Sequence, residues 1–525
     1  MSDQPPPAGP PPALADTRPW WKQLNRYHWY VFALCAMGWL FDTMDQKIFT
    51  TSRQPAMESF LPHVTELEKA NVNFYGGIVT SIFILGWATG GLIFGILGDK
   101  WGRAKTMALT ILVYAFFTGF SALAQTWWQF AIGRFLTGLG VGGEFAAGAS
   151  LLAEVLPQTA RVKALGMLQA LSAIGNIFGA QLFGYIEPHF GWRQLYFVGA
   201  APALLAMFVR FGLKEPDKWV QAKADTAKAR ERGEKIKMGG IGSVFSHPKW
   251  RRNALAGMCL AIAGVIGLWS IGFYLPELIR TIFPDVSKDT KPLIQRVLDA
   301  PDKSGQDAAV AQLAADTRMG EWIKLANSVK APEVNADGSL NSALSPDSHR
   351  DLELVLYRSK LIAFGENLQQ IGAFLGMLVF AYFSARYGRR LAFLIAFVLA
   401  WASVIFVMTT FHRPTDIYYM WPIMGFCMLL PFGGYAIYFP ELFPTRLRTT
   451  GVGLCYNVGR YVAATGPVLL GYLARALEGH TATMHPFRVS ALIVSACYLI
   501  GLAALIWAPE TAGHPLPEEE RGFSH

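Results

Sequence analysis

Long apolar runs separated by short polar loops make up most of the chain. A helix needs roughly 20 apolar residues to cross the hydrocarbon core of a bilayer, so each run is long enough to span a membrane. The pattern therefore predicts about twelve membrane-spanning helices. The first six are expected near residues 30–51, 75–97, 106–124, 129–154, 164–187 and 195–213. The second six are expected near residues 254–280, 360–383, 391–411, 418–440, 450–474 and 488–508.

The composition agrees with a membrane protein. Of the 525 residues, 52% are hydrophobic and only 16% are charged, whereas soluble domains carry about 25% charged residues. The formal net charge of +9 does not indicate a nucleic-acid partner, because Lys and Arg alternate between loops instead of forming one basic face. All five cysteines lie in apolar runs without metal-ligand spacing. We therefore expect no metal and no cofactor, and membrane lipid as the surroundings.

The basic residues also predict the orientation. Lys22 and Arg26 precede the first span, and further Lys and Arg residues follow the second, fourth, eighth and tenth spans. The opposite loops are poor in both residues where they are short. Because cytoplasmic loops carry the excess of Lys and Arg, we expect both termini in the cytoplasm and the protein in the cell membrane.

Two polar segments interrupt the spans and set the expected domains. Residues 214–252 carry a Glu–Lys pattern that predicts short surface helices. Residues 284–357 contain amphipathic stretches that predict a small external helical cap. The expected domains are a disordered cytoplasmic tail 1–28, a six-helix bundle 29–213, a cytoplasmic connector 214–252, a second six-helix bundle 253–509 with the external insert 284–357, and a cytoplasmic tail 510–525.

A short box occurs twice, at the same helix boundary of each half. The fourth span ends in Glu154-Val-Leu-Pro, and Arg161 follows it. The tenth span ends in Glu441-Leu-Phe-Pro, and Arg448 follows it at the same spacing. The repeat indicates two duplicated six-helix bundles. Such a duplication is typical of secondary transporters, whose substrate site lies near the middle of the membrane between the two halves.

The loop after the second span, Asp99-Lys-Trp-Gly-Arg, returns after the eighth span as Ala385-Arg-Tyr-Gly-Arg, without the acid. We expect the loops and boxes together to form an inner gate that bridges the halves when the cytoplasmic side is closed. Asp99 can also cap the eleventh span near Thr449 and Thr450. The alternative is a set of ordinary surface ion pairs, which are worth little. The expected gate residues are Asp99, Arg103, Glu154, Arg161, Arg389, Glu441 and Arg448.

These motifs resemble those of a known family. The Asp99 loop resembles the signature between helices 2 and 3 of the major facilitator superfamily, and the run Arg134–Gly142 resembles its helix 4 motif. The boxes after the fourth and tenth spans are similar to family features. The resemblance implies an all-α membrane protein, with twelve transmembrane helices in two pseudo-symmetric six-helix bundles that rock about a central site.

Four details are similar to the organic-acid/proton symporter branches of that family, of the aromatic-acid, sialate and lactate types. They are Asp42-Thr-Met-Asp45, Gly142-Gly-Glu-Phe, Gly191-Trp-Arg and Tyr456-Asn-Val-Gly-Arg. The aromatic-acid branch usually has glycine after the first aspartate, where this chain has Thr43. The resemblance therefore leans toward the sialate and lactate type.

Three carboxyl groups at membrane depth are candidates for proton coupling: Asp42, Asp45 and Glu144. Asp42 and Asp45 lie on one face of their helix because they are three positions apart. Charged groups at this depth are expensive, so they suggest a function or a pairing role. The alternatives are a structural ion pair or a polar group that faces a wet cavity. Lys47 lies toward the outer end of the same span, where its side chain can reach the interface.

Arg460, in the middle of the eleventh span, is the leading candidate for substrate binding, because a guanidinium can grip a carboxylate with two parallel hydrogen bonds. The alternative is a salt bridge to Glu366 or to one of the aspartates. Asn457 lies one turn before it. Other polar or aromatic groups near helix midpoints are candidates for the cavity wall, each with packing as its alternative: Tyr456, Gln169, Asn176, Gln369, Gln370, Trp269 and Tyr274.

The leading functional hypothesis is proton symport of a small organic anion, a monocarboxylate or an acidic sugar, by a monomer whose partners are the solute and protons. The first alternative is a sugar porter, which the boxes and Leu213-Lys-Glu-Pro after the sixth span resemble. The second is a transporter-like receptor with residues 284–357 as its sensing domain. An enzyme is not expected, since no nucleophile–base arrangement or phosphate loop appears.

Overall fold

The computed structural model describes residues 18–61, 66–201, 212–232, 238–272, 278, 358–465, 469–470, 472–473, 476–477 and 484–517. Every regular element in these ranges is helical. The expected external insert, residues 1–17 and 518–525 of the two tails, and Tyr274 lie outside the described residues.

The helices follow the predicted order. The first half contains α1 (Arg26–Phe60), α2 (Glu66–Trp101), α3 (Arg103–Ser121), α4 (Trp127–Val155), α5 (Gln158–Phe190) and α6 (Trp192–Gly199). The connector contains α8 (Asp217–Glu231) and α9 (Ile241–Ser246), so the expected short helices are confirmed. The second half contains α10 (Pro248–Ile266), a π-helical turn (Gly267–Ile271), α16 (Arg358–Tyr387), α17 (Arg389–Thr410), α18 (Ile417–Glu441), a 3₁₀ turn (Thr445–Leu447), α19 (Arg448–Ala463), α21 (Pro486–Ser495) and α22 (Tyr498–Ala504).

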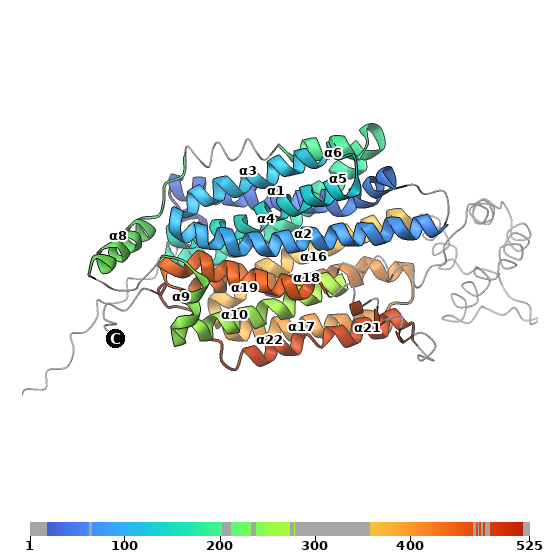
Figure 1. The fold of residues 1–525 in the computed structure, drawn as a ribbon. Helices are drawn as coiled ribbons and strands as arrows, with labels where there is room; N and C mark the ends of the chain where they lie inside the picture. Colours follow the sequence, from blue (N-terminus) through green and yellow to red (C-terminus); the bar gives the residue numbers. More distant parts are fainter. Residues whose placement is uncertain are drawn as a thin grey trace, which may run out of the picture.

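The two halves form two bundles that lie side by side (Figure 1). They meet where α2 packs against α19 and where α5 packs against α16. Within the described residues, 9 helices are long and apolar enough to cross a membrane. Helices α8 and α9 lie at the same end of the bundles; α8 projects beyond the long helices, and α9 packs against α10 and α19 (Figure 1).

Several helix boundaries differ from the prediction. The first helix continues to Phe60 and the second begins at Glu66, beyond the apolar runs, because helical hydrogen bonding does not stop where hydrophobicity ends. The first helix starts at a capping box, in which the Asn25 side chain accepts from the backbone N–H of His28 at 2.8 Å. In the expected eleventh span, α19 ends at Ala463, and residues 469–470, 472–473 and 476 are again helical. The twelfth span is divided into α21 and α22.

The duplication extends to the packing of glycines. In the first half, a Cβ on Gly86 of α2 would overlap the backbone carbonyl of Phe135 in α4. In the second half, a Cβ on Gly372 of α16 would overlap the carbonyl of Pro422 in α18, at the matching positions. Small residues let membrane helices approach closely and pack without a hydrophobic driving force. The same close contact therefore builds each bundle.

The turns before α3 and α17 are also duplicated. Gly102 and Gly388 adopt φ values of 119° and 96°, in the left-handed region that glycine tolerates. A glutamate caps the helix that follows each turn. Glu215 accepts from the backbone N–H of Arg103 at 2.7 Å, and Glu510 accepts from that of Arg389 at 2.9 Å.

The Glu510 cap is rich in hydrogen bonds. Its carboxylate accepts from the backbone N–H groups of Arg389, Arg390, Thr511 and Ala512 at 2.9–3.0 Å. Burial raises the pKa of the Glu510 carboxyl, but these N–H groups outweigh burial and hold the pKa below its ordinary value. The carboxylate form is therefore the one that fits the start of α17.

Candidate functional site

A cavity of about 120 Å³ lies between the two halves. Its wall combines indole rings and amide side chains with three charged groups, which is a common composition for a small-molecule site. The lining residues from the first half are Trp39, Thr43, Gln46, Lys47, Thr50, Trp87, Gln169, Ser172 and Asn176. Those from the second half are Leu268, Trp269, Gly272, Glu366, Gln369, Gln370, Leu429, Phe432, Tyr456 and Arg460.

Arg460 lies in this wall, held between two aromatic rings. Its guanidinium carbon is 4.0 Å from the ring centroid of Trp87, in the first half, and 4.2 Å from that of Tyr456, on its own helix. Such cation–π contacts fix a guanidinium without neutralising it. One of its nitrogens donates to the side-chain oxygen of Asn457. In the described part of the chain, Arg460 forms no ion pair within 4.0 Å, and its Nε–H has no acceptor.

Two further donors of the wall have no acceptor among the described residues. They are the indole N–H groups of Trp39 and Trp87, both buried. A buried donor without a partner costs free energy until something accepts from it. Together with Arg460, these groups make the wall suited to a solute that carries oxygen acceptors.

Lys47 and Glu366 form an ion pair across the cavity, with 2.6 Å between Lys47 Nζ and Glu366 Oε2. The pair joins α1 of the first half to α16 of the second. Lys47 therefore does not simply extend toward the interface, as the sequence suggested, because a carboxylate lies close enough to pair with it. Glu366 is correspondingly not the partner of Arg460.

The three predicted carboxyl groups lie in different surroundings. Asp45 accepts from the hydroxyl of Thr118 at 2.9 Å and lies 3.6 Å from Arg134. Asp42 and Glu144 are each about 1% exposed. Neither forms an ion pair in the described part of the chain. Neither carboxyl oxygen of Asp42 has a hydrogen-bond partner among the described residues. Asp42 interacts electrostatically with both Glu144 and Arg460. Asp42 thus groups with Glu144 as well as with Asp45.

Most of the predicted wall residues reach the cavity. Tyr456, Gln169, Asn176, Gln369, Gln370 and Trp269 all line it. Asn457 does not; it packs against α2 at Gly91 and holds Arg460 from behind. The sequence did not single out Trp39 and Trp87, or Lys47 and Glu366 as a pair, because their proximity arises only when the halves pack together. The one available signal was the position of Trp39 and Trp87 near the middle of their expected spans.

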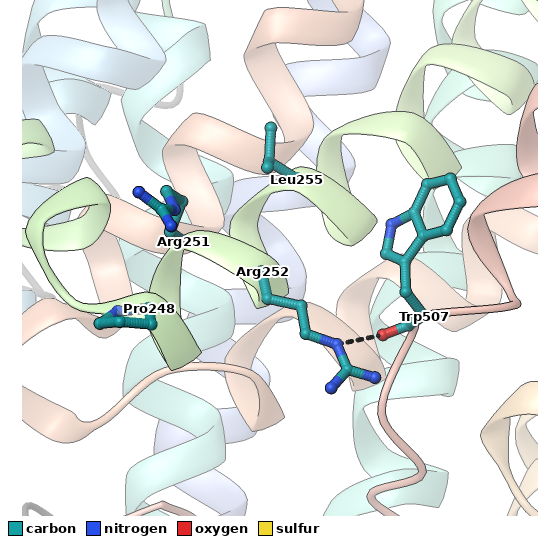
Figure 2. Close-up of a pocket in the computed structure, with 5 residues that line it drawn as sticks. All are labelled: Pro248, Arg251, Arg252, Leu255 and Trp507. Carbon is teal, nitrogen blue, oxygen red and sulfur yellow. Dashed lines mark hydrogen bonds between the residues drawn. The ribbon is translucent and has the colours of Figure 1, made fainter.

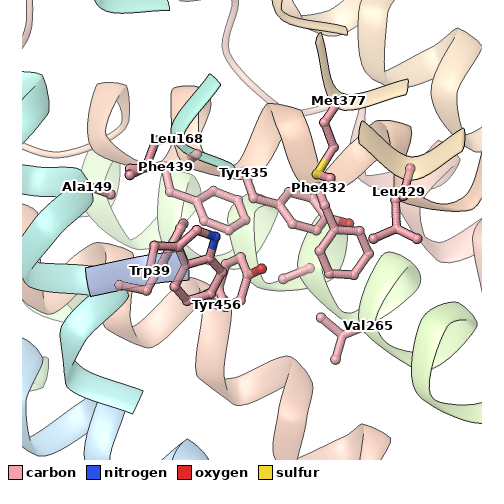
Figure 3. Close-up of a cluster of buried hydrophobic side chains, with 14 of the residues drawn as sticks. Trp39, Ala149, Leu168, Val265, Met377, Leu429, Phe432, Tyr435, Phe439 and Tyr456 are labelled. Carbon is pink, nitrogen blue, oxygen red and sulfur yellow. The ribbon is translucent and has the colours of Figure 1, made fainter. Parts of the chain in front are cut away.

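Aromatic rings from both halves cluster beside the cavity, and Trp39, Phe432 and Tyr456 belong both to this cluster and to the cavity wall (Figure 3). Phe145 from the first half packs on Tyr456 from the second, with ring centroids 4.7 Å apart. Trp39 packs on Phe145 at 4.6 Å, and Phe439 lies 6.1 Å from Tyr456. The cluster therefore packs rings from both halves against one another where the halves meet.

The end of the molecule where α8 and α9 lie, which we call the charged end, carries the predicted gate residues. Arg103 lies 3.1 Å from Asp99 and 3.1 Å from Glu154, all three fully buried. Arg448 of the second half reaches the same Glu154 oxygen at 2.7 Å. Arg103 also donates to the backbone carbonyl of Thr445, in the second half. Glu154 and Arg103 therefore tie the two halves together.

Asp99 makes a second link between the halves. Its two oxygens accept from the backbone N–H groups of Thr449 at 3.1 Å and Thr450 at 2.8 Å. The predicted cap at the start of α19 is confirmed. The indole of Trp219 in α8 donates to the backbone carbonyl of Asp99 at 2.8 Å, so the connector helix is fastened at the same point.

The second copy of the motif stays within its own half. Arg389 donates to both oxygens of Glu441, at 2.9 and 3.1 Å, and Thr511 donates to Glu441 at 2.6 Å. Arg161, the counterpart of Arg448, donates only to the backbone carbonyl of Leu156, at 3.4 Å, and forms no ion pair within the described residues. The structure thus brings six of the seven predicted gate residues into ion pairs and leaves Arg161 beside them.

A second hollow, of about 350 Å³, lies on the surface of the second half (Figure 2). It is lined by Pro248, Arg251, Arg252, Leu255 and Trp507. Arg252 Nε donates to the carbonyl of Trp507 at 2.9 Å. The first half contributes no lining residue, so this hollow is not the site between the halves.

Two family models match different parts of the chain. The model described as Major Facilitator Superfamily matches residues 43–283, and the model described as Sugar (and other) transporter matches residues 373–523. The chain belongs to the major facilitator superfamily. This family consists of transporters rather than enzymes, as the sequence predicted.

This major facilitator protein is also similar to individual proteins, among them two relatives in sequence and one solved structure. It is 26% identical over 501 residues to a probable 4-methylmuconolactone transporter of Cupriavidus pinatubonensis, covering 94% of this chain and 93% of the relative. It is 26% identical over 403 residues to a cis,cis-muconate transport protein of Acinetobacter baylyi, covering 76% and 78%. It is similar to the proton:xylose symporter XylE bound to 6-bromo-6-deoxy-D-glucose, with a TM-score of 0.56, 15% identity, and coverage of 93% and 98%. The predicted major facilitator fold is confirmed.

Proposed function

We propose that this protein moves a small organic anion, a monocarboxylate or an acidic sugar, across the cell membrane by proton symport with alternating access. The observation that carries the proposal is Arg460. It lies in the wall of the cavity between the halves, is held by two aromatic faces, and forms no ion pair in the described part of the chain. A buried guanidinium needs an anion, and a solute carboxylate can supply one.

The rest of the wall supports an anionic solute. The indole N–H groups of Trp39 and Trp87 add two donors that can meet carboxylate oxygens. One relative is named for muconate, a dicarboxylate, and this supports an anionic solute without indicating whether it carries one carboxylate or two. The combination favours a carboxylate held at Arg460, with amide side chains around the remainder of the solute.

The buried carboxyl groups support proton coupling. An ionised Asp42 or Glu144 without a cation would cost several kcal/mol at this depth, whereas the protonated acid carries no charge to compensate. A proton on either group therefore offsets the charge of a carboxylate that binds at Arg460. Asp45, with Arg134 at 3.6 Å, is the third candidate, since its ion pair can break and re-form during the cycle.

We assign the charged end to the cytoplasm, with both termini on that side, because the basic connector lies there. The ties of Glu154 and Asp99 across the halves then act as an inner gate that stabilises the state closed toward the cytoplasm. A monomer suffices for this cycle, because the cavity and both ends are formed by one chain.

A second candidate function is a sugar porter. The wall carries Gln169, Asn176, Gln369 and Gln370, and amide side chains suit sugar hydroxyls. Arg460 favours an anion over a neutral sugar. The receptor alternative depends on residues 284–357, which lie outside the described residues, and transport measured after their deletion would test it.

The experiment is a ligand panel on the purified protein, read as thermal stabilisation. Benzoate, sorbate, gluconate and N-acetylneuraminate are compared with glucose and xylose. We expect at least one acid, and no neutral sugar, to raise the melting temperature. Stabilisation by a sugar alone would favour the sugar porter instead.

Arg460→Lys tests the assigned residue. Loss of the bidentate fork should weaken binding of the acid about tenfold or more, since tenfold is 1.4 kcal/mol. The matched control is Arg488→Lys. Arg488 is also buried, but it donates to the backbone carbonyls of Met408 and Phe411 away from the cavity. Unchanged affinity in Arg460→Lys would remove this residue from the site.

A further inference from the structure

The two cations of the cavity wall are in different states. Arg460 forms no ion pair in the described part of the chain, whereas Lys47 is 2.6 Å from a carboxylate oxygen of Glu366. The side chains of Lys47 and Glu366 are 15% and 30% exposed, and both line the cavity. A solute in the cavity can therefore reach this ion pair.

Glu366 occupies the position that a solute carboxylate would take on Lys47. An ammonium group at membrane depth needs an anionic partner, and α16 supplies one as a tethered side chain. A solute carboxylate that approached Lys47 would have to displace Glu366 and would meet the repulsion of a like charge. Lys47 therefore cannot bind a solute anion while its ion pair with the Glu366 carboxylate is intact.

The charged residues of the cavity wall carry one net positive charge, which one solute carboxylate neutralises. The lining residues carry two cations, Lys47 and Arg460, and one carboxylate, Glu366. Asp42 and Glu144 are not among the lining residues and add no further charge when both are protonated. An acid with one carboxylate at Arg460 completes the balance. The second carboxylate of a diacid would face Glu366 without a free cation.

We infer that Glu366 is a specificity-determining residue, which restricts the site to acids with one carboxylate by occupying Lys47. When the charge of Glu366 is removed, Lys47 becomes a second carboxylate-binding residue and the site accepts diacids. This inference rests on the proposed function, because it assumes that Arg460 binds the first carboxylate.

The test compares acids that share a skeleton and differ by one carboxylate: benzoate with terephthalate, sorbate with trans,trans-muconate, and gluconate with glucarate. Their affinities are measured by calorimetry on purified wild type and Glu366→Gln. Wild type should prefer the monoacid of a pair that binds. Glu366→Gln should shift the ratio of diacid to monoacid affinity about tenfold toward the diacid, the worth of one charge-assisted contact.

Two variants control the comparison. Glu58→Gln removes the same charge from α1 outside the cavity lining and should leave the ratio unchanged. Lys47→Gln combined with Glu366→Gln removes both charges, leaves neither partner unpaired, and should return the ratio to that of wild type.

The outcomes separate the two claims. If a monoacid binds wild type and Glu366→Gln leaves the affinity ratio unchanged, the inference is overturned and the proposed function stands. A gain for the diacid that persists without Lys47 also overturns it. If no acid of any pair binds wild type, the proposed function fails and takes this inference with it.

Discussion

In the first half Arg103 forms an ion pair with Glu154, and at the matching positions of the second half Arg389 forms an ion pair with Glu441. Each arginine also donates to the backbone carbonyl at the matching position of the preceding helix: Arg103 to Gly98 at 3.1 Å and Arg389 to Ser384 at 2.7 Å. These shared contacts stay within one half. They stabilise the junction of two neighbouring helices in each bundle.

The contacts that differ are those that cross between the halves. Glu154 also pairs with Arg448 of the second half, whereas Glu441 takes its further hydrogen bond from Thr511 of its own half. Asp99 bonds across to α19, and its counterpart Ala385 has no carboxylate to do so. The contacts that occur in both copies of the motif thus stabilise each half, and the contacts that occur in the first copy alone join the two halves.

The start of the facing helix explains why one acid suffices. In the second half, α19 begins only at Arg448, after a 3₁₀ turn, so the N–H groups of Thr449 and Thr450 have no partner within the helix. In the first half, α5 already begins at Gln158, and the matching Val162 and Lys163 lie inside it. Their N–H groups bond within the helix, which leaves nothing for an acid at position 385 to cap.

The sharpest test of this comparison replaces each glutamate by its amide. Glu154→Gln leaves Arg448 buried without its anion and leaves Arg103 with Asp99 alone. Breaking a buried ion pair costs about 3–5 kcal/mol. Because one of these contacts joins the halves, the state closed at the charged end should lose stability. We expect the rate at which a membrane-impermeant thiol reagent, added on the charged side, labels Ser172→Cys in the cavity to rise more than about tenfold.

Glu441→Gln is the matched control. It removes the partner of Arg389 within one half, so it should lower the melting temperature without changing the labelling rate. Both variants are made with Cys259 replaced by alanine, because the other four native cysteines are buried. Equal labelling rates in Glu154→Gln and Glu441→Gln would contradict the distinction between contacts that stabilise one half and contacts that join the two halves.

Asp99→Asn should have a smaller effect of the same kind. An amide oxygen can still accept from α19, but the charge that stabilises the helix N-terminus is lost, and replacing a cap costs about 0.5–2 kcal/mol. Transport should fall and labelling of Ser172→Cys should rise several-fold, while the affinity for the bound acid stays constant. If labelling does not change, the Asp99 contact is not part of the gate.

Glu510→Gln tests a cap that belongs to one half. Since the pKa of Glu510 is lowered in the folded protein, its contribution to stability is present above the ordinary glutamate pKa of about 4.3 and is lost as the pH falls through the lower, folded-state value. Wild type should melt above Glu510→Gln at neutral pH, and the two should converge in acid. Because the side chain is exposed, the difference should be small. A difference that does not depend on pH would point to packing instead.

Ala385→Asp should have the smallest effect. The side chain is exposed, and the N–H groups that it would cap are already bonded, so the melting temperature and labelling rate should stay near wild type. A marked shift toward the closed state would show that the second loop can join the halves after all.

The sequence predicted the fold and much of this arrangement for physical reasons. Apolar length identifies spans, and the repeated box places Glu154 and Glu441 at equivalent helix ends, so their pairing with the loop arginines could be expected. The cap by Asp99 was also predictable, because an acid near a helix start has one evident use. The sequence could not reveal that Arg161 lacks an ion pair, since that depends on how the two bundles meet.

The cavity was harder to predict than the charged end. Arg460 stood out because a cation at membrane depth is rare. Its contact with Trp87 and the pairing of Lys47 with Glu366 join residues that are far apart in the chain, and no spacing encodes them. The grouping of Asp42 with Glu144 arises in the same way, from the packing of α1 against α4.

The central claim is that a proton gradient drives uptake of an organic anion through this cavity. Its most direct test reconstitutes the protein in liposomes, imposes a pH gradient that is acid outside, and measures labelled gluconate or whichever hydrophilic acid of the panel binds best. We predict accumulation above the external concentration, collapse of that accumulation on adding an uncoupler, no accumulation in protein-free liposomes, and a much lower initial rate of uptake with Arg460→Lys. Uptake by the wild type that is indifferent to the gradient and to the uncoupler would contradict the account.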